Sequence, residues 1–83
     1  MSVEDKIREI IADSLSQDPE ETTDDSYLSD DFGMDPYDLE DLAGVLMEEF
    51  SVEISEDDIE SWETVSDVIA MVMEKLEKDG QGD

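Results

Sequence analysis

The stretch Asp31-Phe32-Gly33-Met34-Asp35-Pro36-Tyr37-Asp38-Leu39 decides where the second helix of this chain begins. Asp35 is a good N-cap, because its carboxylate can accept a backbone N–H from the first helical turn. Pro36 suits the first helical position, since an N–H there would have no intrahelical partner and the ring fixes φ at about −65°, which is already helical. The sequence therefore predicts a helix that starts at position 36.

Apolar residues recur with helical spacing in three segments. They predict helices over about 3–15, 36–50 and 65–78, with Ser2 as the N-cap of the first and Thr64 as the N-cap of the last. The capped acidic segment 55–60 predicts a short helix of one or two turns. Residues 50–54 alternate in polarity, but a lone strand would have no partner, so we expect an extended loop there.

The connection over 16–34 is rich in turn-forming residues and is long for a small domain, which indicates that it is anchored. Tyr27, Leu28 and Phe32 are the predicted anchors, and Trp62 is expected as a partly buried cover beside the short helix. The predicted fold is all-α: an antiparallel four-helix bundle with three longer helices, one short helix and a long first loop. Residues 1–78 would form this single domain, and 79–83 would be a disordered tail with nothing to bury.

Composition excludes several classes of function. A chain of 83 residues that is 37% apolar has room for one modest core. It contains no cysteine and no histidine, so disulfides, thiolate nucleophiles, imidazole bases and soft-metal sites are all excluded, and we expect a protein that is not an enzyme. No apolar run approaches the roughly 20 residues of a membrane span, and the first residues lack a secretory signal, which predicts a cytoplasmic protein without a membrane partner.

The charges are distributed unevenly as well as summing to −24. Lys6 and Arg8 lie near the start, Lys75 and Lys78 lie near the end, and the long acidic middle contains no basic residue. Such a surface repels nucleic acid and acidic membranes and attracts basic protein patches. We therefore expect a monomer whose partners are proteins with basic docking sites. An EF-hand calcium loop centred on Gly33 would need oxygen ligands where the chain has apolar residues, so no metal site is predicted.

Several fragments of the chain resemble acyl carrier proteins. Asp31-Phe32-Gly33 is similar to the family's Asp-Leu-Gly, Glu48-Glu49-Phe50 to its Glu-Glu-Phe, and Thr64-Val65 to the start of its last helix. These fragments follow the family's order and spacing over nearly the whole chain. The resemblance implies the same four-helix architecture that the apolar spacing predicts.

The resemblance also implies a cofactor position. The family attaches phosphopantetheine to the serine of an Asp-Ser-Leu motif, and this chain has Pro36 at that position. Proline has no hydroxyl, so a phosphodiester cannot form there and the expected cofactor is none. Ser26, in Asp25-Ser26-Tyr27-Leu28, and Ser29 stay open as alternative attachment sites, although neither precedes a helix.

The same resemblance implies a docking face on the helix over 36–50. Its candidate partner-binding residues are the acidic ones around the apolar stripe, namely Asp35, Asp38, Glu40, Asp41 and Glu48. The partners implied are carrier-dependent synthases or transferases. Gly44 departs from the family, which usually has an apolar contact residue there.

One main function and two alternatives follow. The first is an acyl-carrier-like protein, related to the carriers of fatty acid or polyketide synthesis, that acts as a non-catalytic docking or regulatory protein. The alternatives are an anionic interaction module that mimics nucleic acid, and a working carrier that uses another serine. Tyr37 and Leu39 also differ from the family's usual residues, which favours natural divergence over an introduced Pro36.

Overall fold

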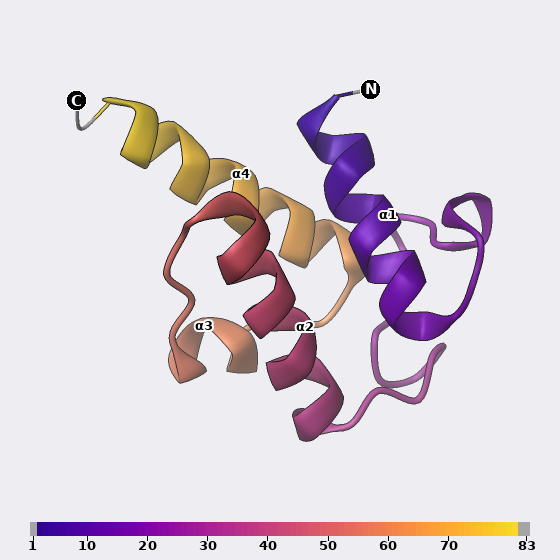
Figure 1. Cartoon of the computed structure of the whole chain (residues 1–83). Coiled ribbons are helices and arrows are strands. Elements are labelled where there is room, and N and C mark those ends of the chain that lie inside the picture. The colour runs from indigo at the N-terminus through magenta and orange to yellow at the C-terminus, as the bar shows by residue number, and fades with distance from the viewer. Residues whose placement is uncertain (1, 82–83) are drawn as a thin grey trace.

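A computed structural model describes residues 2–81 of the chain. Within that range the α-helices are α1 (Val3–Leu15), α2 (Pro36–Phe50), α3 (Glu56–Glu60) and α4 (Val65–Gln81), and a 3₁₀ helix, η1, spans Pro19–Glu21. Helix α1 packs against α2 and α4, and α3 packs against α2 (Figure 1). The predicted all-α four-helix fold is therefore confirmed.

Two of the three long helices have the predicted bounds, and the last one differs. Helices α1 and α2 match 3–15 and 36–50, whereas α4 ends at Gln81 instead of 78. Residues 79–81, which were expected in the tail, belong to α4, and residues 82–83 lie outside the described residues. Before Gly80 the chain has no residue that strongly opposes a helix, so α4 can continue past its last apolar residue.

The core is built from the predicted stripes of the three long helices. Fully buried side chains come from α1 (Ile7 and Ile11), from α2 (Leu42 and Leu46) and from α4 (Val65, Val68 and Val72). Val3, the first residue of α1, is 43% exposed because it lies at the end of the bundle.

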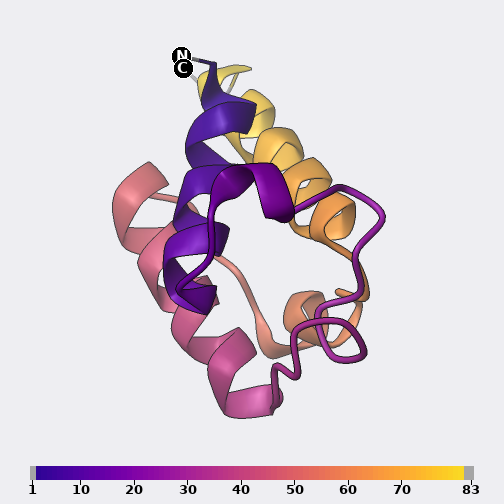
Figure 2. The same ribbon diagram turned by 90° about the vertical axis from the view of Figure 1, so that its right-hand side faces the viewer.

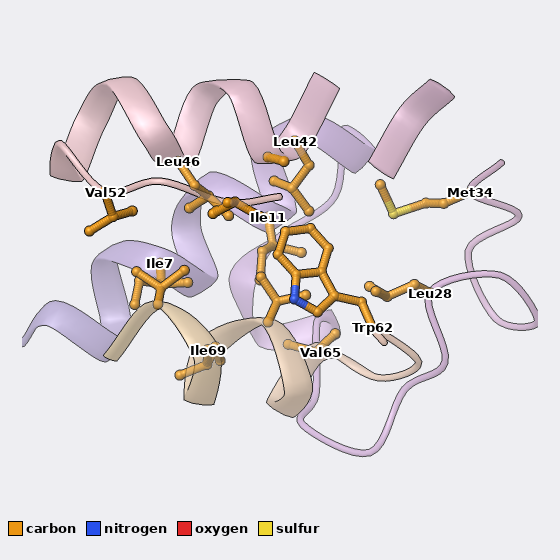
Figure 3. Close-up of a cluster of buried hydrophobic side chains, with 14 residues drawn as sticks. Ile7, Ile11, Leu28, Met34, Leu42, Leu46, Val52, Trp62, Val65 and Ile69 are labelled. Atoms are coloured by element: carbon orange, nitrogen blue, oxygen red, sulfur yellow. The ribbon is translucent and has the colours of Figure 1, made fainter. Parts of the chain in front are cut away.

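Trp62 is a core residue, so its predicted role as a partly buried cover was wrong. Its side chain is 5% exposed and lies among labelled core residues that include Ile11, Leu42 and Val65 (Figure 3). The indole N–H donates to Sδ of Met71 at 3.1 Å. The indole can be buried because this contact satisfies its polar group.

The long connection between α1 and α2 is anchored, as predicted, but not by all of the predicted residues. Leu28 is fully buried and Phe32 packs partly against the core, whereas Tyr27 is 48% exposed. Tyr27 pairs with Thr64 in an isolated bridge, and the turn that begins at Leu28 places the Leu28 side chain in the core while Tyr27 stays half exposed.

Hydrogen bonds hold this connection against α1 and the start of α4. The Arg8 guanidinium donates to the Thr22 carbonyl at 2.7 Å and pairs with Asp24. The Val65 N–H donates to the Ser26 carbonyl at 3.1 Å. Figure 2 shows the connection running down one side of the bundle to the start of α2. Its path fixes where the first turn of α2 lies relative to the rest of the bundle.

The first turns of the helices are capped by side chains of neighbouring residues. Ser2 caps α1, Ser55 caps α3, and each of these caps is completed by an aspartate three residues later. At the start of α4, Asp67 accepts the N–H groups of Glu63 and Thr64 at 2.9 and 3.0 Å. The hydrogen bond from the Thr64 N–H is the main reason that the pKa of Asp67 is lowered.

Helix α3 is too short to be stable alone, and an ion pair ties it to α4. Lys75 Nζ lies 3.0 Å from Oδ2 of Asp58. The pKa of Asp58 is lowered, first by its hydrogen bond from the Ser55 N–H and next by that from Lys75. Phe50 is the last residue of α2 and Ser51 is left-handed (φ 55°), so the predicted loop covers only residues 52–54, where Val52 and Ile54 are buried.

The few basic side chains bridge different elements. Lys6 pairs with Glu49 of α2 at 3.3 Å, Arg8 with Asp24 of the connection, and Lys75 with Asp58 of α3. With 28 carboxylates and 4 basic residues, however, most of the negative charge cannot be neutralised within the chain. The folded state therefore concentrates like charges that the unfolded chain spreads apart.

We expect cations to stabilise the fold. Sodium chloride or millimolar magnesium chloride should raise the melting temperature by about 5 °C or more, equivalent to about 1 kcal/mol in a domain of this size. The measurement is thermal unfolding followed by circular dichroism. Sodium and magnesium salts compared at equal ionic strength separate screening from cation binding. A melting temperature that stayed constant or fell as salt was added would contradict the prediction.

Candidate functional site

The start of α2 is held by two reciprocal hydrogen bonds. Oδ1 of Asp35 accepts the Asp38 N–H at 2.9 Å, and Oδ2 of Asp38 accepts the Asp35 N–H at 3.2 Å. Pro36 lies between them as the first residue of the helix, and its side chain is exposed. The predicted N-cap is confirmed, and position 36 is presented to solvent on a fixed backbone.

A surface groove of about 400 Å³ begins beside Pro36 and runs between α2 and α3. Leu39, Ile59 and Trp62 provide its apolar surface. The carboxylates of Glu40, Glu56 and Glu60 also line this groove. The groove can accept an apolar group, and its carboxylates would favour a positively charged neighbour.

The two alternative serines lie in different surroundings. Ser29 is exposed and lines the same groove as Pro36. The hydroxyl of Ser26 instead lies 2.7 Å from that of Thr23 in a hydrogen bond, and the Ser26 carbonyl accepts the Val65 N–H. Ser29, and not Ser26, therefore lines the groove that begins beside Pro36.

The candidate partner-binding carboxylates are all exposed and divide between two sides of α2. Glu40 lines the groove beside Pro36, whereas Asp38 and Asp41 line a second groove on the α1 side of the helix. Asp35 lies at the helix start and Glu48 lies near its end. In the described part of the chain no three carboxylates are placed to hold a metal ion, and no helix is long and apolar enough to cross a membrane.

A family model and several known proteins match this chain over most of its length. The family model described as "Phosphopantetheine attachment site" matches residues 5–72. The chain belongs to the acyl carrier protein family. It is 43% identical over 74 residues to an acyl carrier protein of Clostridium perfringens, covering 89% of this chain and 97% of that protein. It is 44% identical over 75 residues to one of Chlamydia trachomatis (90% and 97%) and 41% identical over 75 residues to one of Solidesulfovibrio magneticus (90% and 96%).

The residue at the attachment position does not fit the group that the family model describes. A phosphodiester to the protein requires a side-chain oxygen, and the pyrrolidine ring of Pro36 has none. The helix start itself is well formed, with a capped backbone and an adjacent groove.

The sequence did not reveal the groove. Trp62 and Ile59 approach the start of α2 only because the short helix α3 folds back against it. Ser29 likewise reaches the groove through the path of the long connection. A periodic pattern reports which residues are buried along one helix, but not which distant residues line a surface between two helices.

Gly44 lies within α2, and its replacement by alanine should stabilise the fold. A Cβ built at Gly44 meets nothing within 4 Å, so no close contact requires a glycine there. We expect Gly44→Ala to raise the free energy of unfolding by about 0.5–1 kcal/mol, measured by urea denaturation.

Gly33→Ala is the matched control for this prediction. A Cβ at Gly33 also meets nothing within 4 Å, but its φ is +67°, which strains a residue with a side chain. We expect this variant to lose about 1 kcal/mol. If both variants changed stability in the same direction, backbone conformation would not be the deciding difference.

Proposed function

We propose that this protein is an acyl-carrier-type docking protein that carries no phosphopantetheine at position 36. One observation supports the proposal above the others. Both hydrogen bonds of the capping box at the start of α2 are in place, yet the first residue of the helix is a proline without a hydroxyl. The scaffold that presents a covalent arm is therefore kept while the attachment atom is absent.

The exposed carboxylates of α2 support a role in binding other proteins. A net charge of −24 favours partners with Lys- and Arg-rich surfaces, and the similarity to acyl carrier proteins indicates that these are carrier-dependent synthases or transferases. By binding without a reactive arm, the protein would regulate or scaffold such enzymes, in fatty acid or related synthesis in the cytoplasm, and would catalyse nothing itself.

The attachment part of the proposal is tested by mass spectrometry. The unaltered chain is incubated with coenzyme A and a promiscuous phosphopantetheinyl transferase, and its intact mass is measured. We expect no adduct. An adduct mapped to Ser29 or Ser26 would overturn the proposal and identify a working carrier that uses another serine.

The docking part is tested by competition. The unaltered chain should slow the labelling of an ordinary acyl carrier protein by the same transferase, because both would occupy its docking site. The double substitution Glu40→Lys and Asp41→Lys should relieve the inhibition.

The matched control is Glu20→Lys with Glu21→Lys, which reverses two exposed charges in η1, away from α2. This control should still inhibit. Equal loss of inhibition by both double variants would contradict docking through α2 and would favour a general anionic interaction module instead.

A further inference from the structure

Two side-chain contacts join the end of α3 to α4. Nζ of Lys75 lies 3.0 Å from Oδ2 of Asp58, and the indole N–H of Trp62 donates to Sδ of Met71 at 3.1 Å. Asp58 and Trp62 are four residues apart, and so are Met71 and Lys75. Because residues four apart lie on the same face of a helix, one face of α4 holds the segment 58–62 at two successive positions.

Trp62 holds the end of α3 as well as its own place in the core. Its backbone N–H donates to the Ile59 carbonyl at 3.1 Å, so Trp62 continues the last turn of the helix. Helix α3 has five residues and is too short to be stable without outside contacts. Ile59 and Trp62 also line the groove beside Pro36. The shape of that side of the groove therefore depends on the contact between Trp62 and Met71.

Met71 combines this contact with access from solvent. Its side chain is only partly buried, whereas that of Met34 is 5% exposed. Met47 and Met73 are partly buried too, but within residues 2–81 neither of their sulfurs accepts a hydrogen bond comparable to the one from Trp62. Among the described methionines, Met71 is thus the one whose sulfur is both within reach of a small oxidant and part of a structural contact.

We propose that Met71 is a site of reversible oxidation by hydroperoxides, and that its sulfoxide loosens the end of α3. A sulfur lone pair attacks one peroxide oxygen, the S–O bond forms as the O–O bond breaks, and the second oxygen leaves with the electron pair and takes a proton from water. The sulfur is oxidised by two electrons and the peroxide is reduced. Methionine sulfoxide reductases reverse this change. The inference goes beyond the proposed function and does not depend on it.

The packing around Trp62 explains why the sulfoxide should matter here. Oxidation turns an apolar, flexible side chain into a polar one. The indole lies with Leu42 on one side and Val65 on the other (Figure 3), in a close-packed interior with little room for an added oxygen. The indole N–H must leave the sulfur, either to bond the new oxygen from a shifted position or to lose its partner. Trp62 therefore moves in both cases, while Asp58 and Lys75 still hold the first turn of α3.

The test is treatment of the folded chain with hydrogen peroxide. We expect mass spectrometry to map an added oxygen to Met71, and the emission of Trp62, the chain's only tryptophan, to shift to longer wavelength as the indole gains contact with water. The melting temperature should fall by about 4–8 °C. Oxidation of Met47 and Met73 with Met71 unchanged would overturn the inference. Full oxidation of Met71 with unchanged emission and melting temperature would overturn it as well.

Two variants assign the response to one sulfur. Met71→Leu keeps an apolar side chain but removes the oxidisable atom, so peroxide should no longer shift the emission of Trp62. Met73→Leu is the matched control, because it removes another partly buried methionine of α4 and should leave the shift as in the unaltered chain. An equal response of the two variants to peroxide would contradict the assignment.

Reduction of the oxidised chain gives a second measurement that needs no variant, in case Met71→Leu does not fold. Methionine sulfoxide reductases of both stereochemical types, added together, should remove the oxygen from Met71 and return the emission and the melting temperature to their starting values. If mass spectrometry showed Met71 fully reduced while the emission stayed shifted, another oxidised residue would be responsible and the inference would fail.

Discussion

Replacing Pro36 with serine should allow phosphopantetheine to be attached at position 36. Serine restores the oxygen that the phosphodiester requires, at a position that Asp35 and Asp38 hold at the start of α2. The exposed position gives a transferase access to the new hydroxyl. The measurement is intact mass after incubation with coenzyme A and a promiscuous phosphopantetheinyl transferase, with a gain of one phosphopantetheine as the expected result.

Pro36→Ala is the matched control, because it removes the proline ring without adding an oxygen. Both variants should lose a similar amount of stability, about 0.4–1 kcal/mol, since proline restricts the unfolded chain. Only the serine variant should be labelled. If Pro36→Ser stayed unlabelled while still folded, the transferase would not recognise α2, and docking through this helix would be contradicted.

Trp62→Ala should cause the largest loss of stability of the changes considered. The indole is 5% exposed, packs against the core and donates to Met71. Truncating a buried tryptophan to alanine costs about 3–5 kcal/mol. A chain of this length has a total stability of about 4–12 kcal/mol, so the variant would be close to unfolding. Urea denaturation followed by circular dichroism measures the loss, since the variant lacks the chain's only tryptophan.

Two further variants locate the origin of this effect. Trp62→Phe keeps an aromatic ring but removes the N–H donor, and should lose only about 1–2 kcal/mol. Tyr37→Ala removes an aromatic side chain that is 78% exposed and should change stability by no more than about 0.5 kcal/mol. A similar loss for Trp62→Ala and Tyr37→Ala would contradict the placement of Trp62 in the core.

Local patterns predicted the helices well because their determinants lie close together in the sequence. Ser2, Asp35, Ser55 and Thr64 each cap a helix with partners three residues away, and each was visible as a cap. The end of α4 was predicted too early, because apolar spacing stops at Leu76 while the helical backbone continues to Gln81. A helix can extend beyond its buried stripe, so burial patterns set only its minimum length.

Residues outside the helices were harder to place. Tyr27 and Leu28 both have large side chains with apolar surface. Only the path of the backbone decides that Leu28 faces the core. The buried indole of Trp62 donates its N–H to Sδ of Met71, which lies nine residues away on α4. No short-range pattern contains that contact.

The sequence alone determined the all-α architecture, the start of α2 and the absence of a hydroxyl at position 36, because spacing, capping and side-chain chemistry are properties of neighbouring residues. The tertiary structure decided what surrounds that position: the groove with Trp62 and Ile59 on one side of α2, and the groove with Leu15 and Phe32 on the other. Each groove joins residues from segments far apart in the chain, and only the packing of α1 and α3 against α2 brings them together.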